Sequence, residues 1–381
     1  MSNPTSAAPE LRLVDALMTR RALVCCGAGG VGKTTVSAAL GLAGARLGRR
    51  VLVVTIDPSR RLAETLGVAR HSAHPSPIDS DRLRALGVSP PGTLDAWMLD
   101  PGVVSDRTVK NFAKSPEDAA RLLANPVYQG LSRLTAGMQE YTAVEAMHGF
   151  VQEGRYDLVI LDTPPARNAL RFLEAPTRVR AFLDRRIFEF FAPSEAGLIR
   201  RITGNVVEKV LDLTLGEGTR RSTQEFFALF GTLLHHLERN QAEMLKFLQS
   251  DAVGFLLVTS PQRAAVEEAL ALEARAQAAL GLPLLGRILN QSLAPEASPD
   301  APPAIPPTID LLGPSPSPEA LAALKAVLAL AVTELAEEAE HRSLAASLSQ
   351  AAGRTWVLPR LRTAASDLEA LTLLVDRVLS T

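Results

Sequence analysis

The sequence predicts an α/β fold in which a mostly parallel sheet is flanked by helices and carries an inserted helical subdomain. Three observations predict it. An apolar strand, a glycine-rich turn, a helix and a second apolar strand follow one another within residues 21–56, the order of a βαβ unit. Further apolar runs that suit buried strands recur at 156–161, 252–259 and 282–289. Helical patterns separate these runs, as parallel pairing of strands requires.

The expected elements follow from the spacing of apolar residues and from the positions of glycine and proline. Short apolar runs predict strands at 21–26, 50–56, 93–100, 156–161, 252–259, 282–289 and 356–360. Apolar residues at helical spacing predict helices at 11–20, 34–47, 261–280, 318–353 and 367–379. Glycine, proline and serine interrupt residues 71–91 throughout, so this stretch is expected to form loops.

The composition is that of an ordinary globular protein. Of 381 residues, 47% are apolar and 21% are charged, which suffices for a core. The net charge of −1 gives no basic face, so no nucleic-acid partner is expected. Arginine pairs such as Arg49-Arg50 are scattered among acids, and most of them are expected on solvated helix faces. No apolar run approaches the ~18 residues of a membrane span, and no leader pattern is present. We therefore expect a cytoplasmic protein with at most peripheral membrane association.

The two cysteines, Cys25 and Cys26, are neighbours in the first expected strand. Adjacent strand residues point to opposite faces of a sheet, so these two are not placed to bridge each other or to share a metal. We expect both to be small core residues, and the lack of a disulfide framework fits a reducing cytosol.

Residues 27–35, Gly-Ala-Gly-Gly-Val-Gly-Lys-Thr-Thr, match the pattern G-x-x-x-x-G-K-[ST] of a phosphate-binding P-loop. Glycines let backbone N–H groups surround a polyphosphate, and the following helix adds its positive end. Lys33 is expected to reach the β- and γ-phosphates, and the Thr34 hydroxyl to bind Mg²⁺. A glycine turn that binds nothing is the alternative, and the strand–turn–helix context argues against it. The loop residues expected to contact ATP or ADP are Gly29, Gly30, Val31, Gly32, Lys33, Thr34 and Thr35.

Two aspartates follow apolar strands, at the edge where open α/β sheets place their ligands. Asp162 ends the strand at 156–161 and fits a Walker B carboxylate, which holds the Mg²⁺ shell. Asp57 follows the strand at 50–56; a simple turn-forming role before Pro58 is the alternative to a role in the site.

The domain organisation predicted is an N-terminal segment at 1–20 and one P-loop domain at 21–381. Helical insertions are expected at about 103–153 and 169–250, and a Pro-rich loop at about 294–318. The helices of 169–250 carry more apolar residues than one buried stripe needs. Composition favours a subdomain that packs on itself, and a groove for an apolar client is the alternative.

These motifs resemble those of the arsenite-pump and tail-anchored-protein targeting ATPases, over nearly the whole chain. Residues 136–140, Ala-Gly-Met-Gln-Glu, resemble the family's Pro-Gly-x-x-Glu motif with alanine in place of proline. The other five matches are the P-loop at 27–35, switch I at 55–62, switch II at 162–168, the adenine-binding segment at 289–291 and a late loop at 357–361.

The resemblance implies a P-loop NTPase that hydrolyses ATP with Mg²⁺ and changes conformation with nucleotide state. It implies a homodimer, or a heterodimer with a paralogous ATPase. By the same resemblance Asp57 orients the attacking water and accepts its proton, with Lys33 as the other catalytic residue. Asn290 hydrogen-bonds the adenine, and the loop that carries Pro359 packs against the base. Candidate γ-phosphate sensors are Arg60, Arg61, Thr163 and Pro164.

The chain departs from the family pattern at three places. Ala28 stands where the family has a second lysine that reaches the partner subunit's phosphates. The Cys-x-x-Cys zinc clasp and the arsenite-binding cysteine triad are absent, so regulation by arsenite is disfavoured. Ala28 also supports a second hypothesis, a nucleotide-binding regulatory or scaffold subunit with weak hydrolysis. A third is a targeting factor that shields an apolar protein segment within residues 169–250.

Overall fold

The computed structural model describes residues 12–56, 66, 74–129, 139–163, 217–280, 284–294, 317–350, 354–361 and 368–380. Its strands are β1 (Ala22–Gly27), β2 (Arg50–Thr55), β3 (Ser76–Pro77), β4 (Thr93–Met98), β5 (Leu158–Asp162), β6 (Val253–Thr259), β7 (Leu284–Ser292) and β8 (Thr355–Pro359). They form one eight-stranded sheet in the order β3-β4-β2-β5-β1-β6-β7-β8. Each neighbouring pair is parallel except β3–β4, which is antiparallel. The predicted α/β fold with a mostly parallel sheet is confirmed.

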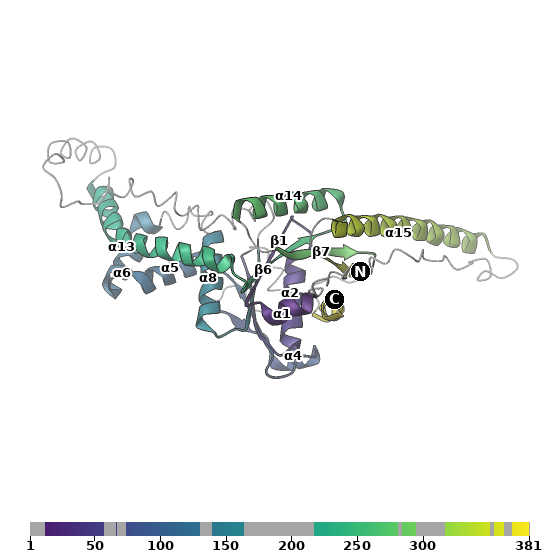
Figure 1. The fold of residues 1–381 in the computed structure, drawn as a ribbon, viewed down its shortest axis with the longest axis horizontal. Coiled ribbons are helices and arrows are strands. Elements are labelled where there is room, and N and C mark those ends of the chain that lie inside the picture. Colours follow the sequence, from purple (N-terminus) through teal and green to yellow (C-terminus); the bar gives the residue numbers. More distant parts are fainter. Residues whose placement is uncertain are drawn as a thin grey trace, which may run out of the picture.

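Helices cover both faces of this sheet (Figure 1). They are α1 (Leu13–Thr19), α2 (Lys33–Arg46), α4 (Ser80–Ala85), α5 (Pro101–Phe112), α6 (Pro116–Ala124), α8 (Gln139–Glu153), α13 (Glu217–Leu248), α14 (Arg263–Leu280), α15 (Pro318–Gln350) and α16 (Leu368–Ser380). Helices α1, α2 and α16 share one buried apolar cluster with alternate residues of the strands. Helices α8, α13 and α14 share a second cluster with the strand residues in between. The sheet is therefore buried on both sides, which explains its continuous apolar runs.

The two cysteines divide between these clusters. Cys25 packs on the side of α1, α2 and α16, and Cys26 on the side of α8, α13 and α14. Both are free thiols, and burial raises the pKa of each to about 12. They are core residues, as expected, and stay protonated at neutral pH.

The expectation that residues 71–91 form only loops is wrong for the part that the structure describes, because this part contains β3 and α4. Asp79 caps α4, because its carboxylate accepts hydrogen bonds from the backbone N–H groups of Asp81 and Arg82, each at 3.0 Å. Only Leu83 of this helix is buried. A helix of 6 residues with one buried side chain shows no apolar period in the sequence, so the capping aspartate was the available signal.

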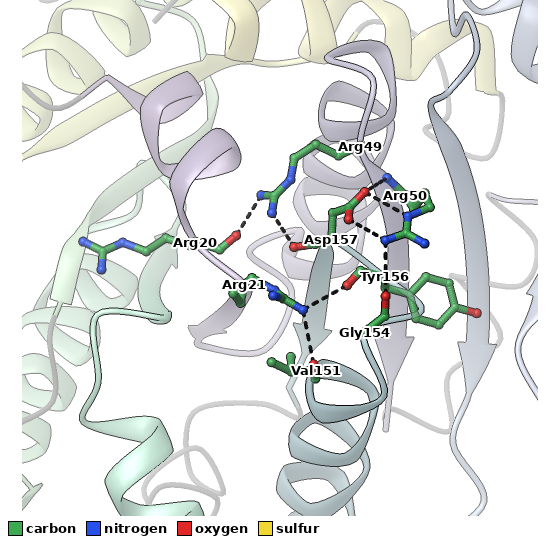
Figure 2. Close-up of polar contacts among 8 residues, drawn as sticks. All are labelled: Arg20, Arg21, Arg49, Arg50, Val151, Gly154, Tyr156 and Asp157. Carbon is green, nitrogen blue, oxygen red and sulfur yellow. Dashed lines mark hydrogen bonds and ion pairs between the residues drawn. The ribbon is translucent and has the colours of Figure 1, made fainter.

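Arg49 and Arg50 lie at the amino end of β2, where they join separate parts of the chain (Figure 2). The Arg49 guanidinium donates to the carbonyl oxygens of Leu17, Asp157 and Arg20, the last at 2.7 Å. Arg50 forms a bidentate pair with the Asp157 carboxylate, through Nε at 3.1 Å and Nη2 at 2.7 Å. This pair is an exception among the arginine pairs, since both side chains join β2 to the start of β5.

Replacing Asp157 with asparagine is expected to lower the free energy of unfolding by about 1 kcal/mol at pH 7, a value reduced for solvent screening. Hydrogen bonds from Arg50 lower the pKa of Asp157 from 3.8 to about 2, and the side chain is 36% exposed. Because the pKa is depressed in the folded state, this stabilisation is present above about pH 4 and is lost as the pH falls toward 2. Urea unfolding at pH 7 and at pH 3 measures the free energy of unfolding of both proteins. The difference between wild type and Asp157→Asn should be smaller at pH 3 than at pH 7.

Asp81→Asn is the matched control, because Asp81 also pairs with an arginine, Arg84, but is 80% exposed. It should change stability by less than about 0.5 kcal/mol. If Asp157→Asn lowers the free energy of unfolding no more than Asp81→Asn does, the contacts of Arg49 and Arg50 with Asp157 in Figure 2 do not stabilise the fold.

Helix α15 extends away from the sheet (Figure 1), and its buried residues all lie in its last third. Its buried residues are His341, Ala345 and Leu348. The ring nitrogen Nδ1 of His341 accepts the N–H of Leu293 at 3.0 Å, immediately after β7. Arg287 of β7 donates to the carbonyl oxygen of Leu348 at 3.1 Å. The C-terminal part of α15 is thus fixed to β7, the strand whose Asn290 contacts the glycine-rich loop.

The expected helical insertion at 103–153 contains α5, α6 and α8. Of the insertion at 169–250, the structure describes α13, whose Phe226 packs against α5 and α6. Residues 164–216, with most of the hypothetical client groove, and residues 295–316, with most of the Pro-rich loop, lie outside the described residues. Among the described helices, none combines the length and apolarity needed to cross a membrane.

Candidate nucleotide-binding site

The glycine-rich loop connects β1 to α2 and lies at the carboxyl ends of the central strands. Helix α2 begins at Lys33, with Gly32 as its N-cap. Asp162 at the end of β5 is in register with Cys25 of β1 and with Thr55 of β2. The loop, the start of α2 and the ends of two neighbouring strands therefore meet at one place, as the sequence predicted.

Two of the loop glycines are required by close packing. A Cβ on Gly27 would lie 2.0 Å from the carbonyl oxygen of Val258, and a Cβ on Gly32 would lie 2.3 Å from Nδ2 of Asn290. Gly32 also has φ of 85°, in the left-handed region that favours glycine. Gly29 and Gly30 are exposed, so part of the loop backbone is open to solvent.

Lys33 is folded onto its own loop. Its side chain is buried, and Nζ donates to the carbonyl oxygen of Ala28 at 2.7 Å. The Ala28 methyl group is itself buried, at 6% exposure. The cation therefore lies inside the curve of the loop that the sequence assigns to the phosphates, and Ala28 adds no second charge there.

Thr34 and Asp162 are in direct contact. The Thr34 hydroxyl donates to Oδ2 of Asp162 at 2.7 Å, and Asp162 is fully buried. A hydroxyl and a carboxylate are the hard oxygen ligands that Mg²⁺ takes, so this donor set fits the ion implied by the resemblance. Thr35, the next loop residue, is half-buried.

Thr55, the first residue of the segment at 55–62, is a site residue whose own role the sequence pattern does not predict. Its hydroxyl donates to the same Oδ2 of Asp162 at 3.0 Å, and the residue is 1% exposed. A hydrogen bond of this kind orients a carboxylate toward a metal ion. The available signal was a single hydroxyl residue at the end of an otherwise aliphatic strand, immediately before the Ile56-Asp57 segment.

Asn290 and Pro359 lie at the ends of β7 and β8. The Asn290 side chain is 3% exposed, and its Nδ2 donates to the carbonyl oxygen of Val31 in the loop at 2.9 Å. Pro359 is in register with Ser292 of β7. The structure thus brings both residues to the same side of the loop, opposite to Asp162.

Several expected site residues lie outside the described part of the chain: Asp57, Arg60, Arg61, Pro164 and residues 136–138. Thr163 is described, and its hydroxyl donates to the carbonyl oxygen of Cys25 at 2.8 Å. In this structure the side chain is therefore joined to β1.

The mostly parallel sheet, the glycine-rich loop, the buried Lys33 and the contact between Thr34 and the buried Asp162 define a P-loop nucleotide-binding protein. Residues 20–300 match the family described as "Anion-transporting ATPase", and the chain belongs to that family.

Relatives in this family are named as arsenical-pump and related ATPases. The "Putative arsenical pump-driving ATPase 1" of Aquifex aeolicus is 26% identical over 255 residues, covering 65% of this chain and 57% of the relative. The "ATPase get3" of Aspergillus terreus is 28% identical over 170 residues, 44% of this chain and 47% of the relative. The "ATPase ASNA1 homolog 1" of Paramecium tetraurelia is 27% identical, covering 46% and 50%. The chain spans about half the length of the relatives it matches, and the predicted family resemblance is confirmed.

Proposed function

We propose that this chain is a Mg²⁺-dependent ATPase that changes conformation with the bound nucleotide. The observation that carries the proposal is the 2.7 Å contact between Thr34 and Asp162, beside the buried Lys33 at the start of α2. Family membership supports the same activity. Mg²⁺ held by Thr34 and Asp162 would supply neutralisation of charge on the phosphates.

The chain's own residues then have distinct tasks. Backbone N–H groups from Gly29 to Thr35 surround the phosphates. Lys33, whose Nζ lies at the Ala28 carbonyl oxygen inside the loop, reaches the β- and γ-phosphates. Asp57 orients the hydrolytic water and accepts its proton. Asn290 and Pro359 lie on the side assigned to the base.

The partner and the client belong to the same proposal. The chain acts in the cytoplasm as a homodimer or as a heterodimer with a paralogous ATPase, with at most peripheral membrane association. The relative named as a putative arsenical pump-driving ATPase supports an ATPase that works with another protein. A hydrophobic protein client would bind the helices of residues 169–250.

Asp57→Asn tests the proposal, since it removes the base but keeps the size of the side chain. ATP turnover should fall by about a hundredfold or more, while the affinity for ATP stays within about threefold of wild type. Phosphate release and fluorescent-nucleotide binding measure the two quantities. Unchanged turnover would contradict the role of Asp57, and a wild type that neither binds nor hydrolyses ATP would contradict the function.

Ala28 favours a second candidate function, a regulatory or scaffold subunit with little hydrolysis of its own. The methyl group of Ala28 provides no charge for a partner's phosphates. Ala28→Lys should then raise turnover by about tenfold or more, and Ala28→Met controls for side-chain length without charge. Rapid wild-type turnover that Ala28→Lys does not increase would exclude this candidate.

A further inference from the structure

A cavity of about 270 Å³ lies between α5 and α8, in the group of helices that also contains α13 (Figure 1). Trp97 of β4 and Asn240 of α13 also line it, and none of its described lining residues belongs to the proposed nucleotide site. Sites for small molecules usually measure roughly 300–1,000 Å³, so this cavity has room for a ligand of the smallest kind. The function proposed above gives it no role.

Gly149 of α8 keeps this cavity open. The residue lines the cavity, and a Cβ built on it would meet no atom within 4 Å. Gly149 lies inside α8, where glycine is less favourable than any residue except proline. Neither close packing nor a positive φ requires glycine at this position. What glycine provides here is therefore open space.

Glu145 is a carboxyl group on the wall of the cavity, and it has few partners. The Thr108 hydroxyl donates to its Oε1 at 2.7 Å, but the same hydroxyl lies 3.0 Å from the carbonyl oxygen of Val104. A hydroxyl has a single proton, whereas an ionised carboxylate can accept about four hydrogen bonds. Among the described residues, no other hydrogen bond reaches Glu145. Burial raises the pKa of Glu145 to about 7, because it disfavours the charged form.

The other charged and titratable groups near the cavity do not pair with Glu145. The charge of Arg107 on α5 lowers the pKa of Glu145, but its guanidinium forms an ion pair with Glu153 of α8. Burial lowers the pKa of His148, against the effect of Glu243 on α13, so the imidazole is neutral at pH 7. In the described part of the chain, no cation forms an ion pair with the Glu145 carboxyl group.

Aromatic rings form the apolar part of the wall. Trp97 and Phe150 meet edge to face with their ring centroids 5.6 Å apart, and Phe112 also lines the cavity. Ring faces attract cations as well as apolar groups. The guanidinium carbon of Arg107 already lies 6.0 Å from the centre of the Phe150 ring. A carboxyl group and aromatic rings that share one small cavity fit an organic cation with an apolar body.

We propose that this cavity binds a small primary amine, whose ammonium group pairs with Glu145 and whose apolar body packs against Trp97 and Phe150. The ammonium group supplies the positive charge and the hydrogen-bond donors that the carboxylate needs. Binding favours the ionised form of Glu145, so a protonated Glu145 releases its proton to solvent when the amine binds. The inference does not depend on ATP binding or hydrolysis.

The test is titration with benzylamine, and with benzyl alcohol as its neutral counterpart, followed by ligand-detected NMR at pH 8. Wild type should bind benzylamine at least about tenfold more tightly than benzyl alcohol, and Glu145→Gln should remove this difference. Wild type should bind benzylamine about tenfold more weakly at pH 6 than at pH 8, because a carboxyl group with a pKa of about 7 is mostly protonated at pH 6. Glu145→Gln should remove this pH dependence as well.

Gly149→Leu fills the cavity without touching the carboxyl group. It should lose detectable binding of benzylamine, while its thermal midpoint is unchanged or raised, because leucine is more favourable than glycine in a helix. If Gly149→Leu does not fold, the comparison of wild type with Glu145→Gln decides.

Glu243→Gln is the matched control, because it removes an exposed carboxylate near His148 that does not line the cavity. It should bind benzylamine within about twofold of wild type. A wild type that does not bind benzylamine, or that binds it no better than benzyl alcohol, would overturn the inference. So would a Glu145→Gln or a folded Gly149→Leu variant with wild-type affinity, or a Glu243→Gln variant as weak as Glu145→Gln.

Discussion

Replacing Lys33 with methionine is expected to lower ATP turnover by about a thousandfold or more. The variant keeps the length of the side chain but removes the cation that faces the phosphates in the proposed complex. In the structure this cation is buried against the Ala28 carbonyl oxygen. A buried cation costs stability, so Lys33→Met should also keep or raise the thermal midpoint of the ligand-free chain. Phosphate release and thermal unfolding measure the two effects.

The matched control for this variant is Lys325→Met, because Lys325 is exposed on the far part of α15. It should leave both quantities unchanged. Loss of activity in Lys33→Met together with a large fall in the midpoint would indicate a misfolded loop. If Lys33→Met has a turnover close to that of wild type, Lys33 is not a catalytic residue.

Asp162→Asn is expected to raise the Mg²⁺ concentration needed for half-maximal turnover by at least about tenfold, and to lower maximal turnover by about a hundredfold. Asparagine has nearly the same size, but it is neutral and binds Mg²⁺ weakly. The buried carboxylate accepts hydrogen bonds from the hydroxyls of Thr34 and Thr55, so its replacement also disturbs the orientation of both side chains. A Mg²⁺ titration of turnover measures the change.

Thr55→Val separates the orientation of the Asp162 carboxylate from the binding of Mg²⁺ by that carboxylate. It removes one hydrogen bond to the Asp162 carboxylate, at 3.0 Å, and leaves the carboxylate itself in place. Its effect on the Mg²⁺ requirement should be smaller than that of Asp162→Asn, within about tenfold. An Asp162→Asn variant with the wild-type Mg²⁺ requirement would contradict the proposed metal site.

Most of the strands and the loop could be predicted because their signals are local. The aliphatic run at Val51–Val54 predicts a strand buried on both faces, and β2 is such a strand. The loop pattern likewise lies within nine consecutive residues at 27–35. Asp162 could be placed beside the loop because strand ends meet at one edge of a parallel sheet.

The features that the sequence could not predict depend on partners far along the chain. Asn290 contacts Val31 across 259 positions, and Arg50 contacts Asp157 across 107. No periodicity connects residues so far apart. The positive φ of Gln291 arises from a mismatch of register between β7 and β8, which is a property of the assembled sheet. The roles of the predicted site residues and of the helices at 169–250 remain predictions.

The anchoring of α15 has a mechanical consequence. His341 joins this helix to Leu293, directly beyond the strand end that carries Asn290 and Gln291. From His341 the helix continues to Pro318, roughly 35 Å away at 1.5 Å per residue. A change of about 5° in tilt at the anchored end would move the far end by about 3 Å, several times the usual thermal amplitude of an ordered backbone. The helix is therefore a long arm whose anchored end adjoins the strand end that the proposed function assigns to the nucleotide base.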